Sequence, residues 1–569
     1  DLNTTERLLE STLGRKSVLF RPPYAEDVEP ETPDQVTPLE FTGSLGYYTI
    51  GMQIDPLDWE NPGIDKIVTE TIKQAESGQG NVVLLHDSGG DRSQTVAALP
   101  KIIEGLRQHG FELVTVSDLI GLSRDGVMPP VPKNEQMLVS VDHLGFLIFD
   151  KFDDLTYCLF VLGIGLSVIR LLFIASLALY EWYGRRKKHY DPNYEPRVSV
   201  LVPAFNEEKV IVKTIHSLLR SLYLNFDIIA VDDGSSDGTY PALVEAFGDH
   251  PQVRVLTKPN GGKSAALNYG IAHTDAELIV TLDADTVLRP NALGKLVRHF
   301  CNPQVGAIAG NAKVGNRINI LTYWQALEYI TSQNLERRAF GLLNCICVVP
   351  GAIGAWRREV LLKAGGFVND TLAEDTDLTL TVLEMGYKID YEETAIALTE
   401  APDTVSGFLQ QRFRWMFGTF QAAWKHRHTF LRPRYGALGT IALPNVLVFQ
   451  IIFPLISPLM DLLMIVSLVW AGWQQSQHPD TPSFASIEQV VFYYLLFLCV
   501  DFLAAFIAFL LERKEDWKLM IWLLPQRFFY RQLMYYVAIK STLKAIQGQI
   551  VRWGKLERKS TVSDRVVAR

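Results

Sequence analysis

The sequence predicts an α/β domain joined to transmembrane helices, with a separate acidic module in front of it. Strand-like apolar runs alternate with helical spacing between residues 197 and 400, and long apolar tracts lie on both sides of this segment. Residues 1–150 carry 11 Lys/Arg against 24 Asp/Glu, whereas the rest of the 569-residue chain carries 43 against 39. This asymmetry indicates two compartments, and no basic stripe points to a nucleic-acid partner.

The front module, residues 1–122, contains four widely spaced motifs: FRPPYA (20–25), DPLDW (55–59), VVLLHD (82–87) and VTVSDLI (114–120). They resemble the second half of the polysaccharide deacetylases, which implies a partial (β/α) barrel-like fold. The resemblance also implies that Arg21 orients a catalytic aspartate and that Trp59 and His86 line an acetyl pocket, with His86 as general acid. The alternative for His86 is a buried structural histidine.

The front module departs from that family in one respect. The family's metal-binding Asp and His-xxx-His motifs precede RPPY, but RPPY begins here at residue 21 and no histidine precedes His86. Without these imidazole and carboxylate ligands we expect no deacetylase activity from this chain alone. Because the chain begins at Asp1 with no signal peptide, we expect a fragment or a processed form, with an upstream half lost or a degenerate domain that binds polymer.

The apolar run at residues 155–182, after an expected linker at 123–154, is long enough to span a bilayer as a helix. Arg170 interrupts it, which we interpret as a contact with other helices rather than an ion path. The basic stretch GRRKKHY (184–190) follows, so the positive-inside rule places this side of the membrane in the cytoplasm. Together with the later apolar tracts, this leads us to expect a multi-pass plasma-membrane protein. Residues 1–150 are then extracytoplasmic and residues 190–400 are cytoplasmic.

Acidic residues gather at the predicted carboxyl ends of the strands in residues 190–400, where ligands bind in parallel sheets. Asp283 and Asp285 follow one strand and suit Mg²⁺ or Mn²⁺, although turns and helix caps also produce this spacing. Asp232 and Asp233 follow another, where they accept hydrogen bonds from a nucleoside or form a capping turn. Lys263 starts a helix after a glycine turn, which suits a diphosphate.

A further acidic pair, Glu374 and Asp375, opens an amphipathic helix at LAEDTDLTL (372–380). Acids in a first helical turn often serve only as caps. The functional alternative makes Asp375 a general base for an acceptor hydroxyl.

Five motifs occur in one order: VPAFNEE, VDDGSSDGT, LDADT, AEDTDL and QQRFRW. This order resembles the family-two processive glycosyltransferases, namely the cellulose, chitin, hyaluronan and especially poly-N-acetylglucosamine synthases. The resemblance implies a GT-A-type, Rossmann-like nucleotide-sugar domain. It also implies donor contacts from Glu207, Asp232, Asp233, Lys263 and Asp283, a metal-diphosphate motif of Asp283 and Asp285, and catalysis by Asp375 with Glu374.

The last motif lies in residues 401–436, which we expect to form interfacial helices. The family match assigns Gln411, Arg414 and Trp415 to a QxxRW motif, in which the indole meets the acceptor sugar and the arginine meets the leaving diphosphate. The alternative is an aromatic and cationic belt at a bilayer surface.

The remaining chain is expected to hold transmembrane helices at 437–547 and a basic cytoplasmic tail at 548–569, with the number of spans left open. We therefore expect an inverting enzyme that polymerises a UDP-sugar and exports the growing polysaccharide through the bilayer. The deacetylase-like module favours a polymer with N-acetyl groups, hence UDP-GlcNAc. The alternatives are a non-processive glycosyltransferase acting on a lipid carrier and a non-catalytic export subunit.

Overall fold

A computed structural model describes residues 2–22, 36–78, 80–185, 190–191, 193–477, 484–512, 514–547 and 558–562. The chain divides into two compact units, Asp1–Cys158 and Leu159–Arg569.

The first unit is built around two amphipathic helices, α3 (Ile64–Glu76) and α4 (Ser93–Gln108). The buried residues of each helix recur every three or four positions, which places them on one face. They form a small core with Ile54: Ile67, Ala75, Ala98, Ile102 and Leu106. The other elements of the unit are α1 (Leu2–Leu13), β1 (Leu19–Phe20), α2 (Thr37–Ser44), β2 (Tyr48–Thr49), η3 (Asp58–Glu60), α5 (Val116–Leu119) and α6 (Arg124–Val127).

Strands β1 and β2 pair in parallel, and they are the only strands in the described part of this unit. The partial barrel that we expected for residues 1–122 therefore stays a prediction. The motif residues Pro23 to Ala25 lie outside the described residues.

The second half of the expected linker at 123–154 is helical, because helix α7 runs from Gln136 to Arg185. Three prolines, Pro129, Pro130 and Pro132, precede it, and no proline occurs within it. The charged residues near position 150 end the apolar run, but they do not end a helix. Hydropathy therefore located the apolar part of α7 and missed its start.

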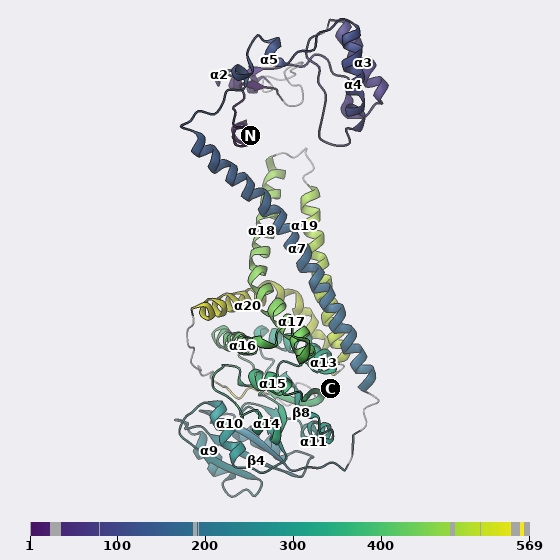
Figure 1. Ribbon diagram of the computed structural model, residues 1–569. Coiled ribbons are helices and arrows are strands. Elements are labelled where there is room, and N and C mark those ends of the chain that lie inside the picture. The colour runs from purple at the N-terminus through teal and green to yellow at the C-terminus, as the bar shows by residue number, and fades with distance from the viewer. Residues whose placement is uncertain are drawn as a thin grey trace. The chain divides into compact units, whose positions relative to one another are not determined.

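The second unit contains an eight-stranded mixed sheet in the order β5-β4-β3-β6-β9-β8-β10-β7, with α9, α10, α11 and α14 beside it in Figure 1. Strands β5, β4, β3 and β6 are parallel neighbours, while β9 runs antiparallel to both β6 and β8. The strands are β3 (Val198–Ala204), β4 (Phe226–Asp232), β5 (Val253–Thr257), β6 (Leu278–Thr281), β7 (Val287–Leu288), β8 (Val305–Val314), β9 (Gly354–Arg357) and β10 (Lys388–Thr399).

Both faces of this sheet are covered. Along β3, Val198, Val200 and Val202 belong to one buried cluster and Leu201 to another, as the alternation of side chains in a strand requires. The helices of this domain are α8 (Ile211–Leu219), α9 (Thr239–Phe247), α10 (Lys263–Ala272), α11 (Ala292–Val297), α12 (Ile320–Glu328), α13 (Leu335–Leu342), α14 (Arg358–Lys363), α15 (Glu374–Glu384) and α16 (Val405–Lys425).

Three segments in the described residues are long and apolar enough to cross a membrane: Val161–Gly184, Leu438–Val466 and Tyr494–Leu511. The second is one run through η8 (Leu438–Ala442), α17 (Leu443–Asn445), η9 (Val446–Ile452) and the start of α18 (Phe453–Gln477). The third ends α19 (Phe484–Leu511). Helix α20 (Leu523–Ile546), after η10 (Trp517–Trp522), is not among them, and it contains Arg527 and Arg531.

Arg170 makes the protein contacts that we expected of it. Its Nε donates to Asn445 Oδ1 at 2.8 Å, and its guanidinium lies 3.5 Å from Glu336. The charge in this candidate span is therefore balanced by groups of the chain.

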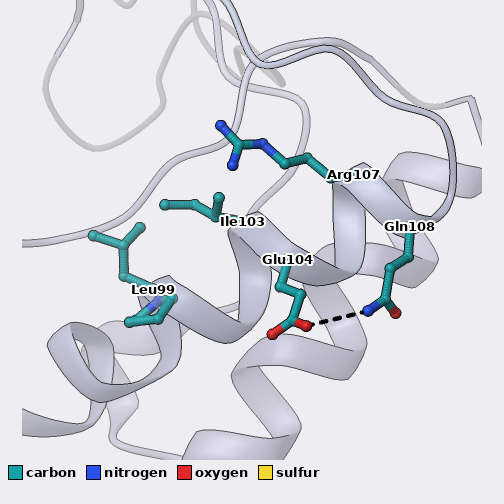
Figure 2. A pocket seen from close by; sticks show the side chains of 6 residues that line it. Leu99, Ile103, Glu104, Arg107 and Gln108 are labelled. Carbon is teal, nitrogen blue, oxygen red and sulfur yellow. Dashed lines mark hydrogen bonds between the residues drawn. The ribbon is translucent and has the colours of Figure 1, made fainter.

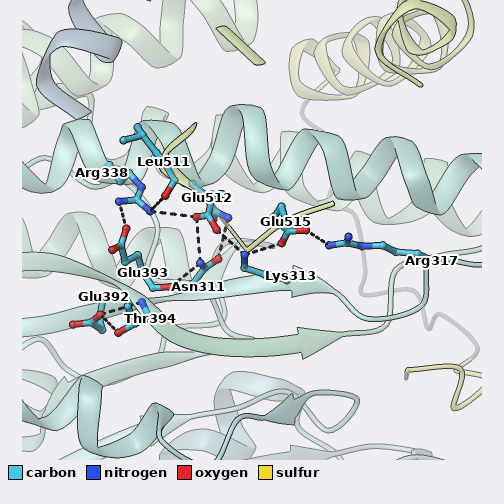
Figure 3. Close-up of polar contacts among 11 residues, drawn as sticks. Asn311, Lys313, Arg317, Arg338, Glu392, Glu393, Thr394, Leu511, Glu512 and Glu515 are labelled. Carbon is cyan, nitrogen blue, oxygen red and sulfur yellow. Dashed lines mark hydrogen bonds and ion pairs between the residues drawn. The ribbon is translucent and has the colours of Figure 1, made fainter. Parts of the chain in front are cut away.

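A buried ionic network ties the end of α19 to the sheet, as Figure 3 shows. Lys313 of β8 contacts Glu512 at 2.6 Å and Glu515 at 2.7 Å, and Glu515 also pairs with Arg317 at 2.9 Å. Arg338 of α13 joins Glu512 and Glu393. Burial opposes the charge on Lys313, but the two glutamates raise its pKa, so the ammonium form is favoured.

Candidate functional site

The first predicted donor residues, Asp232 and Asp233, lie at the carboxyl end of β4 and are buried. Asp233 accepts hydrogen bonds from the backbone N–H of Gly262 at 2.7 Å and from the ammonium of Lys258 at 2.7 Å. Asp232 accepts from the hydroxyl of Thr257 at 2.9 Å. Asp233 thus holds the glycine turn before α10 in place, and the predicted uridine contact stays a prediction.

Lys263, the first residue of α10, joins two other predicted site residues. Its Nζ lies 2.8 Å from Asp283 Oδ1 and 3.0 Å from Glu374 Oε1. Asp283 follows β6 and Glu374 begins α15, so three segments meet at one ammonium group. Burial acts to lower the pKa of Lys263, but Asp283, Glu374 and Asp375 raise it, so this lysine is charged.

Gly351 closes this junction, and the sequence reasoning did not single it out. A Cβ at this position would lie 2.5 Å from Lys263 Nζ, so a side chain there would displace the lysine. Its backbone N–H donates to Asp375 Oδ2 at 3.2 Å. A loop glycine therefore positions both the cation and the candidate base.

Asp375 occupies the first turn of α15 beside Glu374. Its Oδ1 accepts from the backbone N–H of Thr376 at 2.8 Å. Burial, followed by the negative charge of Glu374, raises the pKa of Asp375 to about 6, although Lys263 lowers it. A carboxylate with this pKa is ionised at neutral pH and accepts a proton more readily than an exposed aspartate does.

Asp283 and Asp285 fit a divalent cation by their donor set. Asp285 is buried, and its Oδ2 has no hydrogen-bond donor among the described residues; it contacts only the guanidinium of Arg558, at 2.8 Å, as an ion pair. The described residues hold no group of three or more Asp, Glu, His or Cys arranged around one ion position. A bound Mg²⁺ or Mn²⁺ would therefore complete its shell with water and substrate phosphate oxygens, as Mg²⁺ commonly does.

Helix α16 carries the QQRFRW motif, and its two arginines have different surroundings. Arg412 is buried, pairs with Glu328 at 2.6 Å and donates to the hydroxyl of Tyr530 at 3.1 Å. Its guanidinium also lies 4.3 Å from the ring centre of Trp415. Arg412 thus fixes α16 to α12 and α20 and supports the tryptophan, a role that the motif alone did not reveal.

Arg414 lies within electrostatic reach of the acidic junction. Burial and the neighbouring Arg558 lower the pKa of Arg414, while Glu374 and Asp283 raise it, which places its charge among these groups. Trp415 is 38% exposed and packs near Tyr329. Gln411 is buried, and its side-chain carbonyl oxygen has no hydrogen-bond partner in the described part of the chain.

A close approach joins α16 to the first turn of α15. A Cβ on Gly418 would lie 2.7 Å from the backbone nitrogen of Ala373, so only glycine fits there. The predicted acceptor helix is therefore packed directly against the residue before Glu374 and Asp375.

Glu207 is related to this region through Arg558. Burial acts to lower the pKa of Arg558, whereas Asp285, Glu207 and Asp283 raise it, which puts Glu207 within electrostatic reach of that guanidinium. Its backbone N–H donates to Thr239 at 2.7 Å. The predicted donor contact of Glu207 stays a prediction.

Of the predicted residues in the first unit, His86 has a buried partner. Its Nδ1 contacts Asp58 at 2.8 Å, and Asp58, which is fully buried, also accepts from Thr95 at 2.8 Å. Trp59 is next to Asp58 and exposed, and Arg21 is exposed and makes no hydrogen bond or ion pair with His86 or Asp58 within the described residues. Figure 2 shows a shallow groove elsewhere in this unit, along one side of α4 at Leu99, Ile103 and Arg107.

The second unit is similar in sequence to known glycosyltransferases. Residues 196–418 match the family model described as Glycosyltransferase like family 2. A poly-beta-1,6-N-acetyl-D-glucosamine synthase of Staphylococcus epidermidis is 32% identical over 39% of this chain and 54% of its own length. The synthase of the same description from Staphylococcus aureus is 28% identical over 42% of this chain and 60% of its own length.

The chain thus spans a little over half the length of these curated relatives. Among solved structures, a mannosyltransferase from Pyrobaculum calidifontis in complex with GDP-Man and Mn²⁺ covers 68% of this chain at 21% identity, with a TM-score of 0.46.

The predicted fold class is confirmed for the second unit: residues 196–418 form a GT-A-like α/β domain on a mixed sheet, accompanied by helices long enough to span a membrane. The deacetylase-like part of that prediction stays a prediction. The structure brings together Lys263, Asp283, Glu374, Asp375 and the arginine of QxxRW. Sequence reasoning missed Gly351, Arg412, Asp58 and Arg558. Of these, only Asp58 and Arg412 lay inside a motif that had been noticed.

Proposed function

We propose that this chain is a membrane-bound, inverting, processive glycosyltransferase that polymerises UDP-GlcNAc into a β-linked polysaccharide and exports it. The observation that carries the proposal is the junction at Lys263, where Asp283 of the metal motif and Glu374 of the catalytic pair lie 2.8 Å and 3.0 Å from one ammonium group. The glycosyltransferase family match over 196–418 supports the transferase activity, and the names of the relatives support the sugar.

In this proposal Asp375 removes the proton from the acceptor hydroxyl, which attacks the anomeric carbon with inversion. Lys263 and Arg414 stabilise the negative charge that develops on the departing diphosphate; Lys263 contacts Asp283 and Glu374, and Arg414 lies within electrostatic reach of the same two acids. Mg²⁺ or Mn²⁺ held by Asp283 and Asp285 adds positive charge for the same diphosphate when it is bound. The exposed ring of Trp415 offers a surface for the acceptor sugar.

The packing of α16 favours a polymerase over a single-transfer enzyme. Gly418 brings α16 against Ala373, and the contact of Arg412 with Glu328 and Tyr530 fixes the helix that carries Trp415. An acceptor site held this firmly beside the base suits repeated transfer to one polymer end. The second candidate is a transferase that adds one sugar to a lipid carrier.

The test is to incubate the purified full chain in nanodiscs with radiolabelled UDP-GlcNAc and Mn²⁺, and to size the product. We expect long polymer, none of it with Asp375→Asn, and unchanged UDP binding by that variant. A product that extracts with lipid and carries one sugar would favour the second candidate. Near-normal turnover by Asp375→Asn would exclude the assigned base.

For the first unit we propose a deacetylase-like module that does not hydrolyse acetyl groups by itself. The pairing of His86 with the buried Asp58 supports the resemblance. We expect no acetate release from an acetylated GlcNAc polymer by this chain.

A further inference from the structure

Residues 558–562, far along the chain from the catalytic motifs, dock on the end of β10 beside the donor site. Glu400, the residue after β10, accepts hydrogen bonds from the backbone N–H of Lys559 at 2.9 Å and of Ser560 at 3.1 Å. It also accepts from the hydroxyl of Thr561 at 2.9 Å. One buried carboxylate therefore accepts hydrogen bonds from three successive residues of this segment.

The other contacts of the segment are equally specific. Lys559 pairs with Asp403 at 2.8 Å, and the carbonyl of Val562 accepts from Lys213 at 2.5 Å. Val562 is buried in a small apolar cluster with Val287 and Leu398. A Cβ at Gly315 would lie 2.6 Å from the Val562 side chain, so the sheet leaves room for it only because a glycine is there.

This docking places Arg558 at the metal motif. Its guanidinium lies 2.8 Å from Asp285 Oδ2 and also donates to the carbonyl of Glu400 at 2.7 Å. The ion pair is the polar contact that the structure gives this buried oxygen, since no hydrogen bond to it occurs among the described residues. A divalent cation bound to this oxygen would have to displace Arg558.

We propose that residues 558–562 form an internal counter-ion segment, in which Arg558 neutralises Asp285 in the ligand-free site and competes with the divalent cation for it. The proposal rests on the metal site of the proposed function. Asp285 is buried, and a buried carboxylate must be paired with a positive group. Either a guanidinium or a divalent cation can neutralise this carboxylate, but the two cannot occupy the same side of Oδ2 together.

Charge balance supports an exchange. Arg558 lies within electrostatic reach of Asp285, Glu207, Asp283 and Glu400, so acids outnumber the cation at this point. An Arg558 released from Asp285 by a divalent cation would therefore still have carboxylates near it. Cation binding therefore breaks the ion pair between Arg558 and Asp285, which weakens the docking of residues 558–562.

The test measures Mn²⁺ binding to the full chain in nanodiscs by titration calorimetry, with no donor sugar present. Arg558→Gln should bind Mn²⁺ about tenfold more tightly than the wild type, within the range of typical coupling between two ligands. Arg558→Lys keeps the positive charge, so its Mn²⁺ affinity should stay within about twofold of that of the wild type, which corresponds to almost no change in coupling. Lys559→Gln, which removes the ion pair with Asp403 but keeps Arg558, is the matched control and should raise the Mn²⁺ affinity much less than Arg558→Gln does.

A second readout follows the segment itself. Trypsin cleaves after Arg558 and Lys559, and mass spectrometry of the released peptide should show faster cleavage when Mn²⁺ is added to the wild type. The Asp285→Asn variant should show no such response.

These results separate the two proposals. If Asp285→Asn binds Mn²⁺ as the wild type does, the metal site of the proposed function is wrong. If Asp285→Asn loses binding while Arg558→Gln binds Mn²⁺ no more tightly than the wild type, the competition is wrong and the metal site stands.

Discussion

The pH dependence of the transfer reaction is the most direct test of Asp375 as the base. Burial and the charge of Glu374 raise its pKa to about 6. The protonated acid cannot accept a proton, so activity is present above this pKa and is lost as the pH falls through it. From pH 7 to pH 5 the ionised fraction drops from about nine-tenths to just under one-tenth, a roughly tenfold loss of rate.

An aspartate with an ordinary pKa would predict almost no change over this range, because about nine-tenths of it stays ionised at pH 5. The assay is the initial rate of UDP release at low donor concentration and saturating Mn²⁺, from pH 4.5 to 8. Mn²⁺ binding is measured at each pH, so that protonation of the metal carboxylates is not mistaken for protonation of the base.

The variant Glu374→Gln tests whether Asp375 is the group that titrates in this pH range. Asp375 faces Glu374, Lys263 and Arg337, together with the backbone N–H groups of Gly351 and Thr376. Removing the negative charge of Glu374 should lower the pKa of Asp375 and move the midpoint to lower pH. A rate that stays flat down to pH 4.5, or a midpoint that Glu374→Gln leaves in place, would refute the reasoning.

Three further predictions concern α16 and its surroundings. Arg412→Met leaves Glu328 without its cation and should lower the free energy of unfolding by about 3 to 5 kcal/mol, seen as a lower Tm in detergent; an unchanged Tm would contradict a structural role. Trp415→Ala should shorten the polymer while UDP binding is kept, whereas Trp424→Ala, an exposed tryptophan of the same helix with Arg427 over its ring, should leave polymer length unchanged. Burial opposes the charge on His426, but Asp377 and Glu384 raise its pKa to about 9, so its contribution to stability is complete below about pH 6.5 and is lost as the pH rises through 9. The wild-type Tm should therefore fall between pH 7 and 9.5 more steeply than that of His426→Asn; equal slopes would count against the imidazolium.

Local elements of the fold follow from the sequence to within a few residues. Apolar runs at 198–205 and 226–233 predict strands, and the structure has β3 and β4 there. The helical spacing at 209–222 gives α8, and the acidic start at 372–380 gives α15. These predictions succeed because side-chain periodicity and caps act over a few neighbouring residues. The start of α7 was missed because charged residues end an apolar run without ending a helix.

What the sequence by itself determined is the set of reactive residue types and the strand ends and helix starts that carry them. Asp283, Glu374 and Asp375 were recognisable from motif order alone. Their meeting at Lys263, the glycine at position 351 that leaves room for it, and the different surroundings of Arg412 and Arg414 depend on contacts between distant segments. Arg558 is the clearest case, because nothing near it in the chain signals a partner 273 positions earlier. Only the packing of the sheet, which buries Asp285 and requires a positive charge beside it, decides where that arginine lies.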